Sequence, residues 1–319
     1  MRFLVIGAGA LGGYFGARLL EAGQDVTFLL RERRAAQLQE TGLVVRSPFG
    51  AVHWPAPPWV TREQLQSPYD VVIVGCKAYD LAETIAAFAP AVGPDTLILP
   101  VLNGLAHIDA LRAAFGDSNV LGGYCLISAA LDARGEIHHL NDTHTLVFGV
   151  LNDSAAARVD ELARAFSTAK CDARASAKII DEMWAKWVQI ATAAGMTCLM
   201  RASIGEIISA GGTRFAQALL NEAAAIAAAN RHPLSDAAMQ RIRRAISDPG
   251  SAVTASMLKD LERGGAIEAD HLIGDLLARR PAAGDAGDAG DADADAAAPP
   301  SLLDLVYLHL RVYTGHRPH

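Results

Sequence analysis

The residues with the most recognisable chemistry lie within the first twelve positions. Gly7-Ala8-Gly9-Ala10-Leu11-Gly12 follows an apolar run from Met1 to Ile6 and opens an amphipathic segment from Tyr14 to Ala22. A G-x-G-x-x-G pattern between a strand and a helix is typical of dinucleotide binding. Its glycines permit a tight turn, close approach of the backbone to a pyrophosphate, and close packing of the helix on the strand. The helix N-terminus adds N–H groups and a positive dipole end, so we predict a dinucleotide site here.

The end of the second expected strand, residues 25–30, bears on which dinucleotide is bound. NAD-binding chains usually place Asp or Glu at this point, where the carboxylate accepts hydrogen bonds from the ribose. Here the strand runs into Leu30-Arg31-Glu32-Arg33-Arg34. A guanidinium suits a 2′-phosphate because it is always charged and offers paired planar donors. We predict that Arg31 selects NADP; the alternatives are NAD bound through Glu32 and an exposed helix start without a ligand.

Two polar residues follow apolar strands in the same way. Lys77 comes directly after the run from Val71 to Cys76, and Asn103 comes after the run from Leu97 to Leu102. In a doubly wound sheet, ligands bind outside the carboxyl ends of the strands. We therefore expect both side chains at the rim of a ligand crevice. The alternatives are a lysine exposed on a loop and a turn residue preceding glycine.

Two further candidates lie in the second half of the chain. Lys186 stands between Trp184 and Trp187 in a largely apolar helical segment, where partial desolvation would lower the pKa of its ammonium group toward the range of a general acid. Its alternative role is an i,i+4 ion pair with Glu182. Glu268 opens a helical segment after two glycines, where a carboxylate is also favoured by the helix dipole alone.

The histidines at 138, 139 and 144 raise the question of a metal site. Neighbouring residues of a strand point to opposite faces, so His138 and His139 cannot share one ion. We predict a hairpin with exposed imidazoles and no metal. The four cysteines, Cys76, Cys125, Cys171 and Cys198, are scattered without a C-x-x-C pair, which favours reduced thiols in a cytoplasmic protein.

The elements that must position these residues alternate between strand and helix up to residue 173. Alternating segments with a fingerprint predict an α/β fold, an N-terminal Rossmann doubly wound sheet. Strands expected at 120–130, 135–139 and 145–149 would extend that sheet in antiparallel fashion, and a last strand is expected at 170–173. After residue 175 only helices are indicated, at 176–200, 212–230, 235–247, 251–263, 268–279 and 301–313. We predict a Rossmann NADP-binding domain at 1–173 and an all-α substrate and catalytic domain at 174–319, with the substrate held between them.

Composition narrows the functional class. The chain has 319 residues, 51% of them hydrophobic, which is enough for two cores. A net charge of −7 argues against a nucleic-acid surface, and no apolar run reaches the length of a membrane span. Residues 281–300 repeat Gly, Ala and Asp and are expected to be a disordered loop rather than a calcium site. The sequence leaves the oligomeric state open between a monomer and a homodimer.

The series of motifs resembles that of the ketopantoate reductases over essentially the whole chain except 281–300. The matching positions, in order, are Gly7-x-Gly9-Ala10-Leu11-Gly12, Arg31, Cys76-Lys77-Ala78, Asn103-Gly104, Trp184-x-Lys186, Ser256-Met257-Leu258-x-Asp260 and Glu268-x-Asp270.

The resemblance implies NADPH-dependent reduction of 2-dehydropantoate to (R)-pantoate, in the route to pantothenate and coenzyme A. It implies that Lys186 is the general acid and that Glu268 binds the substrate hydroxyl. The other implied roles are carboxylate binding by Ser256, positioning of nicotinamide and substrate by Lys77 and Asn103, and 2′-phosphate binding by Arg31.

One departure from the family pattern concerns the substrate. The family carries asparagines where this chain has Ile190, Ala194 and Ile204, and losing several buried hydrogen bonds would cost a few kcal/mol of recognition. Gln189 or Thr192 would compensate only if the helix were rotated. The sequence thus supports ketopantoate reduction first, the same chemistry on a more apolar 2-oxo acid or ketone second, and a non-catalytic NADP-binding sensor third. A sensor would need neither the lysine nor the glutamate.

Overall fold

The computed structural model describes residues 1–152, 156–281 and 300–316 and divides into two compact units. Unit 1 comprises Met1–Asn103 and His107–Ile179, and unit 2 comprises Gly104–Ala106 and Ile180–His319. The main division falls after Ile179, beyond the end of the last strand of unit 1, β10 (Asp172–Ala175). The predicted disordered loop lies outside the described residues, apart from its two end positions.

The first sheet of unit 1 is entirely parallel, with strand order β5-β2-β1-β6-β7. Strands β2 and β5 lie on one side of β1, and β6 and β7 lie on the other. This order confirms the predicted doubly wound α/β sheet. Short apolar runs rich in Val, Ile and Leu form these strands because both faces of such a sheet are buried. The strands are β1 (Arg2–Ile6), β2 (Asp25–Leu29), β5 (Trp59–Val60), β6 (Val71–Val74) and β7 (Leu97–Pro100).

The expectation that residues 120–149 extend this sheet was wrong. They form an antiparallel hairpin in a second sheet, which also contains strands that the sequence did not indicate. Among the described residues, an isolated β-bridge between Ile98 and Val120 connects this hairpin to the first sheet. The strands predicted at 135–139 and 145–149 are one strand, Ile137–Val150. His139 pairs with Ala129 and His144 with Ile127, and a β-bulge accommodates the polar residues between the two histidines. The strands are β3 (Leu43–Arg46), β4 (Val52–Trp54), β8 (Leu121–Leu131), β9 (Ile137–Val150) and β10 (Asp172–Ala175).

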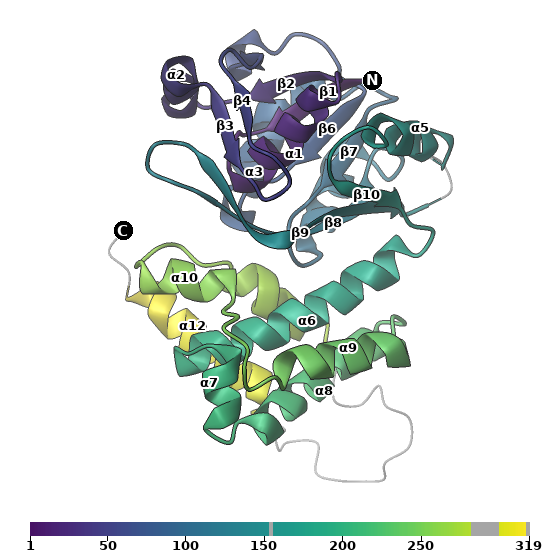
Figure 1. Cartoon of the computed structure of the whole chain (residues 1–319). Helices are drawn as coiled ribbons and strands as arrows, with labels where there is room; N and C mark the ends of the chain where they lie inside the picture. Colours follow the sequence, from purple (N-terminus) through teal and green to yellow (C-terminus); the bar gives the residue numbers. More distant parts are fainter. Residues whose placement is uncertain (153–155, 282–299, 317–319) are drawn as a thin grey trace. The chain divides into compact units, whose positions relative to one another are not determined.

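Helix α1 (Ala10–Glu21) lies between the two sheets and contacts strands of both (Figure 1). Glycine residues on each side of α1 allow the two sheets to approach the helix closely. A Cβ on Gly16 would lie 2.6 Å from the ring of Phe28 in β2, and one on Gly13 would overlap Ile137 in β9. The other helices of unit 1 are α2 (Glu32–Thr41), α3 (Leu81–Phe88), α4 (Ala106–Phe115) and α5 (Ala156–Phe166).

Two of the hairpin histidines are buried, which corrects the prediction of exposed imidazoles. His139 and His144 are only 6% and 5% exposed, and the hydroxyl of Tyr14 in α1 lies 2.7 Å from Nδ1 of His144. Phe49 stacks on His144 with ring centroids 3.9 Å apart. His138 faces the other side of the strand, beside Asp132, in keeping with the period of a strand. Packing against the aromatic side chains of α1 thus buries two histidines that would be exposed to solvent in an isolated hairpin.

A charged side chain is also enclosed beside α1. Arg18 is completely buried, and its guanidinium donates to the carboxylate of Glu21 and to the carbonyl oxygen of Gly50, each at 2.8 Å. It also lies over the ring of Tyr14, 5.1 Å from the centroid. A buried charge is tolerated only when it is paired and hydrogen-bonded, and these contacts meet much of that requirement.

Unit 2 is helical, and no strand occurs among its described residues. Helices α6, α8 and α12 meet around Gly195, where a Cβ would lie 2.8 Å from Leu219 and 3.4 Å from Val306. Helix α7 was not predicted, and the segment expected as a helix at 268–279 contains a π-helical turn at Asp270–Gly274. The helices are α6 (Ile179–Met200), α7 (Ile204–Ser209), α8 (Thr213–Ala229), α9 (Asp236–Ile246), α10 (Ser256–Glu262), α11 (Asp275–Ala278) and α12 (Leu302–Gly315).

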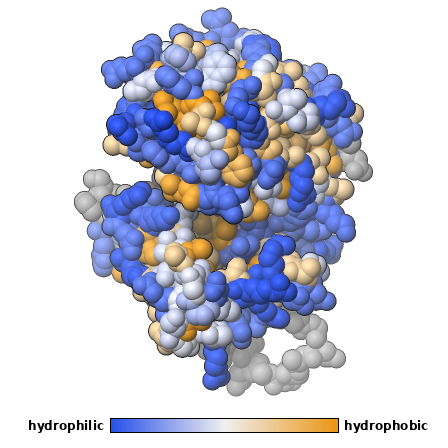
Figure 2. Space-filling view, viewed as in Figure 1, coloured by the Kyte–Doolittle hydropathy of each residue, from blue (hydrophilic) through white to orange (hydrophobic). Residues whose placement is uncertain are grey.

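The surface of the protein is mixed in character. Hydrophilic residues cover much of the visible face, with apolar residues in patches among them (Figure 2). Among the residues described, none of the helices is both long enough and apolar enough to cross a membrane.

The buried imidazole of His144 makes the stability of unit 1 depend on pH. Burial lowers its pKa, and the charges of His139 and Arg18 act in the same direction, against an opposing effect of Asp172. The folded state therefore favours neutral His144, whose stabilisation is complete above the ordinary histidine pKa of about 6.5 and is lost as the pH falls below it. The melting temperature of wild type should fall between pH 7.5 and 5.5 more steeply than that of His144→Gln. The exposed His53→Gln variant should keep the wild-type slope, and parallel slopes for wild type and His144→Gln would contradict this assignment.

Candidate dinucleotide and substrate sites

Four strands of the first sheet have their carboxyl ends at the same edge of the sheet. Ile6 of β1 pairs with Leu29 of β2 and Val74 of β6, and Val74 pairs with Pro100 of β7. The segments that follow these residues therefore leave the sheet at the same edge, beside the point where strand order reverses. These segments carry the fingerprint glycines, Arg31, Lys77 and Asn103. The edge is the position at which doubly wound sheets bind ligands.

The glycine loop after β1 has the form that a pyrophosphate requires. Gly7 has a φ of +77°, and its N–H donates to the carbonyl of Leu29 at 2.9 Å, which fixes the turn. A Cβ on Gly12 would lie 2.6 Å from the Gly7 carbonyl oxygen, so helix and loop pack as closely as backbone allows. A Cβ on Gly9, the N-cap of α1, would meet no atom within 4 Å. Open space therefore lies beside the second glycine, next to the N–H groups of the first helical turn, and these residues fit a dinucleotide.

Arg31 is the N-cap residue of α2, and its side chain is 65% exposed. Its guanidinium lies 2.8 Å from a carboxylate oxygen of Glu83 and 3.6 Å from one of Asp80, both in the segment after β6. Glu32 occupies the first turn of the same helix. The guanidinium thus already pairs with carboxylate oxygens, and the oxygens of a phosphate offer it the same kind of partner.

In unit 2, helix α6 carries Lys186 and also anchors the start of α10. The hydroxyl of Thr197 donates to the carbonyl of Ala193 at 2.8 Å and accepts the N–H of Ala255 at 3.3 Å. Ala255 is the N-cap of the helix that begins at Ser256. Sequence reasoning missed Thr197, because its partner lies 58 residues away.

The same helix holds the segment that follows Glu268. The indole N–H of Trp187, a residue only 1% exposed, donates to the carbonyl of Leu272 at 2.9 Å, within the π-helical turn. The N–H of Leu272 in turn donates to the carbonyl of Glu268 at 2.9 Å. The structure therefore joins the residue after Lys186 to the turn that begins with Glu268. Buried indoles usually find an acceptor, which was the one available signal for this contact.

The three positions at which the family resemblance implies asparagines are apolar here, and two of them are enclosed. Ala194 and Ile204 are 2% and 3% exposed, whereas Ile190, on the same helix as Ala194, is half-buried. Thr192 is fully buried and donates its hydroxyl to the carbonyl of Val188 in its own helix at 2.8 Å. Because that hydroxyl hydrogen is used within α6, Thr192 does not replace a missing amide donor.

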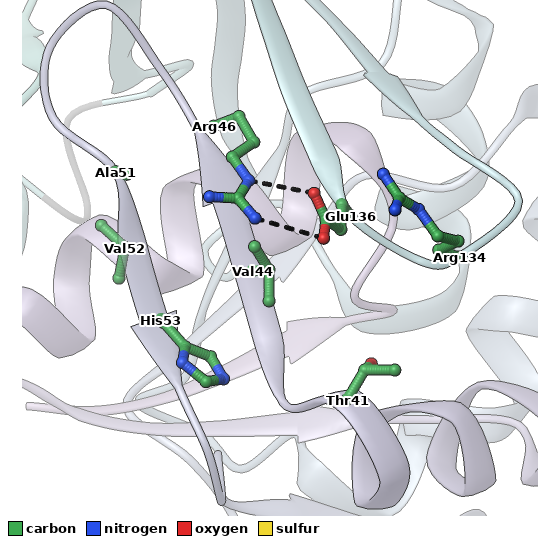
Figure 3. Close-up of a pocket in the computed structure, with 8 residues that line it drawn as sticks. All are labelled: Thr41, Val44, Arg46, Ala51, Val52, His53, Arg134 and Glu136. Carbon is green, nitrogen blue, oxygen red and sulfur yellow. Dashed lines mark hydrogen bonds and ion pairs between the residues drawn. The ribbon is translucent and has the colours of Figure 1, made fainter.

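A shallow pocket of about 400 Å³ lies on the second sheet of unit 1 and includes none of the predicted site residues. Figure 3 shows that Arg46 on β3 and Glu136 beside β9 pair across it. Glu136 also belongs to a group with Asp132 and His138 whose ligand atoms lie within 4.8 Å of one another. Because both carboxylate oxygens of Glu136 accept from Arg46, at 3.0 and 3.3 Å, we assign no metal to this group. The other pocket-lining residues are Thr41, Val44, Ala51, Val52, His53 and Arg134.

All four cysteines are free thiols. Burial raises the pKa of Cys171 and of Cys198 to about 12. Both therefore stay protonated at neutral pH and are poor nucleophiles.

Comparison with known proteins agrees with this geometry. The family description "Ketopantoate reductase PanE/ApbA" matches residues 3–153, and "Ketopantoate reductase PanE/ApbA C terminal" matches residues 178–285. The uncharacterized oxidoreductase YkpB of Bacillus subtilis is 37% identical over 318 residues, which cover 99% of this chain and all of that one.

Solved structures share the whole fold. The 2-dehydropantoate 2-reductase of Geobacter metallireducens is 26% identical with a TM-score of 0.83, covering 98% of this chain and 99% of its own. A D-mandelate dehydrogenase, solved with NADH and anilino(oxo)acetate, reaches the same TM-score at 20% identity and covers 99% of both chains.

The fold and the glycine loop define an oxidoreductase that uses a nicotinamide dinucleotide. The chain belongs to the ketopantoate reductase family, whose two sequence descriptions together match more than half of its length.

The different surroundings of Gly9 and Gly12 predict different effects of the same substitution. Gly9 has a φ of −82°, which any residue adopts, so Gly9→Val should keep the melting temperature of the wild type. Its side chain would occupy the open space and weaken binding of both NADH and NADPH at least tenfold, measured by fluorescence titration. Gly12→Val should instead lower the melting temperature itself, because its Cβ meets backbone. Unchanged dinucleotide affinity in Gly9→Val would place the pyrophosphate elsewhere.

Proposed function

We propose that this protein is an NADPH-dependent reductase of a 2-oxo acid, with conversion of 2-dehydropantoate to (R)-pantoate as the first candidate reaction. Family membership and the named reductase among the structural neighbours support the reaction class. The observation that carries the proposal is the arrangement within unit 2. Helix α6 bears Lys186 and is hydrogen-bonded both to the start of the helix of Ser256 and to the turn after Glu268.

The chemistry follows from these residue types. When bound, the reduced nicotinamide supplies a hydride to the ketone carbon. Negative charge then develops on the carbonyl oxygen, where the ammonium of Lys186 stabilises it and donates the proton that completes the alcohol. Glu268 accepts a hydrogen bond from the substrate hydroxyl, and Ser256 donates one to the substrate carboxylate. Lys77 and Asn103, which follow β6 and β7, orient nicotinamide and substrate.

A second candidate substrate is a 2-oxo acid with a more apolar side chain. The supporting observations are the enclosed Ala194 and Ile204 and the Thr192 hydroxyl bonded within its own helix. A structural neighbour, a D-mandelate dehydrogenase solved with NADH and anilino(oxo)acetate, supports including aryl-bearing 2-oxo acids among the candidates. A purely structural NADP-binding sensor is disfavoured, because it would need neither Lys186 nor Glu268.

Steady-state oxidation of NADPH across a panel of 2-oxo acids tests these alternatives. The panel contains 2-dehydropantoate, branched aliphatic 2-oxo acids and phenylglyoxylate. Highest kcat/KM on 2-dehydropantoate supports the first candidate, and highest kcat/KM on an apolar member supports the second. Absence of turnover on every member, with NADPH still bound, would overturn the proposed reductase activity.

Cofactor preference should depend on Arg31. We expect NADPH to bind at least tenfold more tightly than NADH, because a charge-assisted pair with phosphate contributes about 1.5–3 kcal/mol. Arg31→Ala should remove most of this preference by weakening NADPH alone. Glu83→Gln should strengthen NADPH binding by a few-fold at most, since it releases the arginine from an exposed ion pair worth about 0–1 kcal/mol. Equal dissociation constants of the two cofactors in the wild type would exclude this specificity.

If Lys186 donates the proton, Lys186→Ala should lower kcat by about two to four orders of magnitude and leave the dissociation constant of NADPH unchanged. The matched control is Lys170→Ala, which removes an exposed lysine paired with Glu21 in unit 1. It should keep the wild-type kcat. An alanine variant at 186 that turns over at the wild-type rate would rule out Lys186 as the general acid.

A further inference from the structure

Helix α2 carries a second arginine with a different set of partners. Arg34, three residues after Arg31, donates from Nε to the carbonyl oxygen of Ala8 at 3.0 Å. Its Nη2 donates to the carbonyl of Gly135 at 3.1 Å, and its Nη1 donates to the side-chain oxygen of Gln37 at 2.6 Å. The guanidinium therefore joins the glycine loop after β1 to the turn of the β8–β9 hairpin.

The bond to Ala8 determines which way one peptide group of the loop faces. The peptide between Ala8 and Gly9 is trans. In a trans peptide the C=O and the following N–H point in opposite directions. With its carbonyl turned toward Arg34, this peptide directs the Gly9 N–H away from the guanidinium. The orientation of one loop donor is thus held by a side chain outside the loop.

The hairpin turn is shaped to receive this arginine. Gly135 has a φ of +83°. Its carbonyl shares a peptide group with the N–H of Glu136, which donates to Oδ1 of Asp132 at 2.8 Å, so in this trans peptide the Gly135 carbonyl points the opposite way, toward Arg34. A Cβ on Gly135 would overlap the Arg34 guanidinium. Partial burial lowers the pKa of Arg34, with Asp132 opposing the effect, yet an arginine remains charged at any physiological pH. The guanidinium therefore keeps its charge and all its donors over the physiological pH range.

We propose that Arg34 is a positioning residue for the dinucleotide. It holds the peptide between Ala8 and Gly9 in the orientation in which the glycine loop donates to the pyrophosphate. The inference rests on the dinucleotide site of the proposed function. The pyrophosphate is common to NADH and NADPH, so Arg34 acts on both cofactors, whereas Arg31 acts on the 2′-phosphate alone.

Dissociation constants of NADH and NADPH for the full chain, measured by fluorescence titration, test this assignment. Arg34→Met should weaken both cofactors about tenfold or more, by the same factor, since it removes a charge-assisted hydrogen bond to the loop. Arg34→Lys, which keeps the charge without the planar fork, should recover only part of the affinity. Arg46→Met is the control: it removes the same charge and a contact to the neighbouring Glu136 of the hairpin, and it should keep both wild-type constants.

A second variant, Gly135→Ala, tests the proposal even if Arg34→Met does not fold. Gly135→Ala keeps every charge but displaces the guanidinium, and it should also weaken both cofactors equally. Unchanged constants in folded Arg34→Met, with or without a lower melting temperature, would reduce Arg34 to a structural residue and overturn the proposal. A loss confined to NADPH would overturn it too, by making Arg34 a phosphate ligand. Failure of the wild type to bind either cofactor would instead overturn the proposed function on which it rests.

Discussion

The burial of helix α1 on both sides is the constraint on which the rest of unit 1 depends. One sheet packs against the face containing Gly16, and the other packs against the face containing Gly13. A helix enclosed in this way has little room for side chains, so glycine occupies several of its positions despite a cost of about 1 kcal/mol each in helix propensity. The same close packing at Gly12 brings the helix N-terminus against the loop after β1. Gly12 thus links the packing of the core to the proposed dinucleotide site.

The enclosure also explains the polar cluster beside α1. Arg18 and Tyr14 project from a helix that has no solvent-facing side along its middle turns, so their polar groups must find partners inside the unit. Glu21, the carbonyl of Gly50 and the imidazole of His144 supply those partners. The second sheet is therefore held to the helix by directional bonds as well as by apolar contact. Arg34 extends the same principle to the glycine loop, which is bonded to the hairpin of that sheet.

In unit 2 the long helix α6 holds together the segments that carry the residues of the proposed reaction. Its Trp187 and Thr197 bond to segments 85 and 58 residues distant, and each of these segments carries a residue of the proposed reaction. The π-helical turn is consistent with this, because such turns free backbone groups for other partners and occur often at functional sites. The apolar residues Ile190 and Ala194 on the same helix take no part in these two hydrogen bonds. In the proposed function they bear on which side chain of a 2-oxo acid is accepted and not on how the reacting groups are held.

The sequence by itself determined the local features: four of the five strands of the parallel sheet, the glycine loop, most helices of unit 2 and the strand-end positions of Lys77 and Asn103. These follow from apolar runs, periodicity and turn residues that act within a few positions. Only the tertiary structure decided that residues 120–149 belong to a second sheet and that His139 and His144 are buried. It also decided that Arg34, Trp187 and Thr197 hydrogen-bond to the segments that carry the proposed site residues. Each of these depends on a partner that lies far along the chain. Short strands such as β3 to β5 and a single buried hydrogen bond leave no periodic pattern in the residues that form them, so packing alone specifies them.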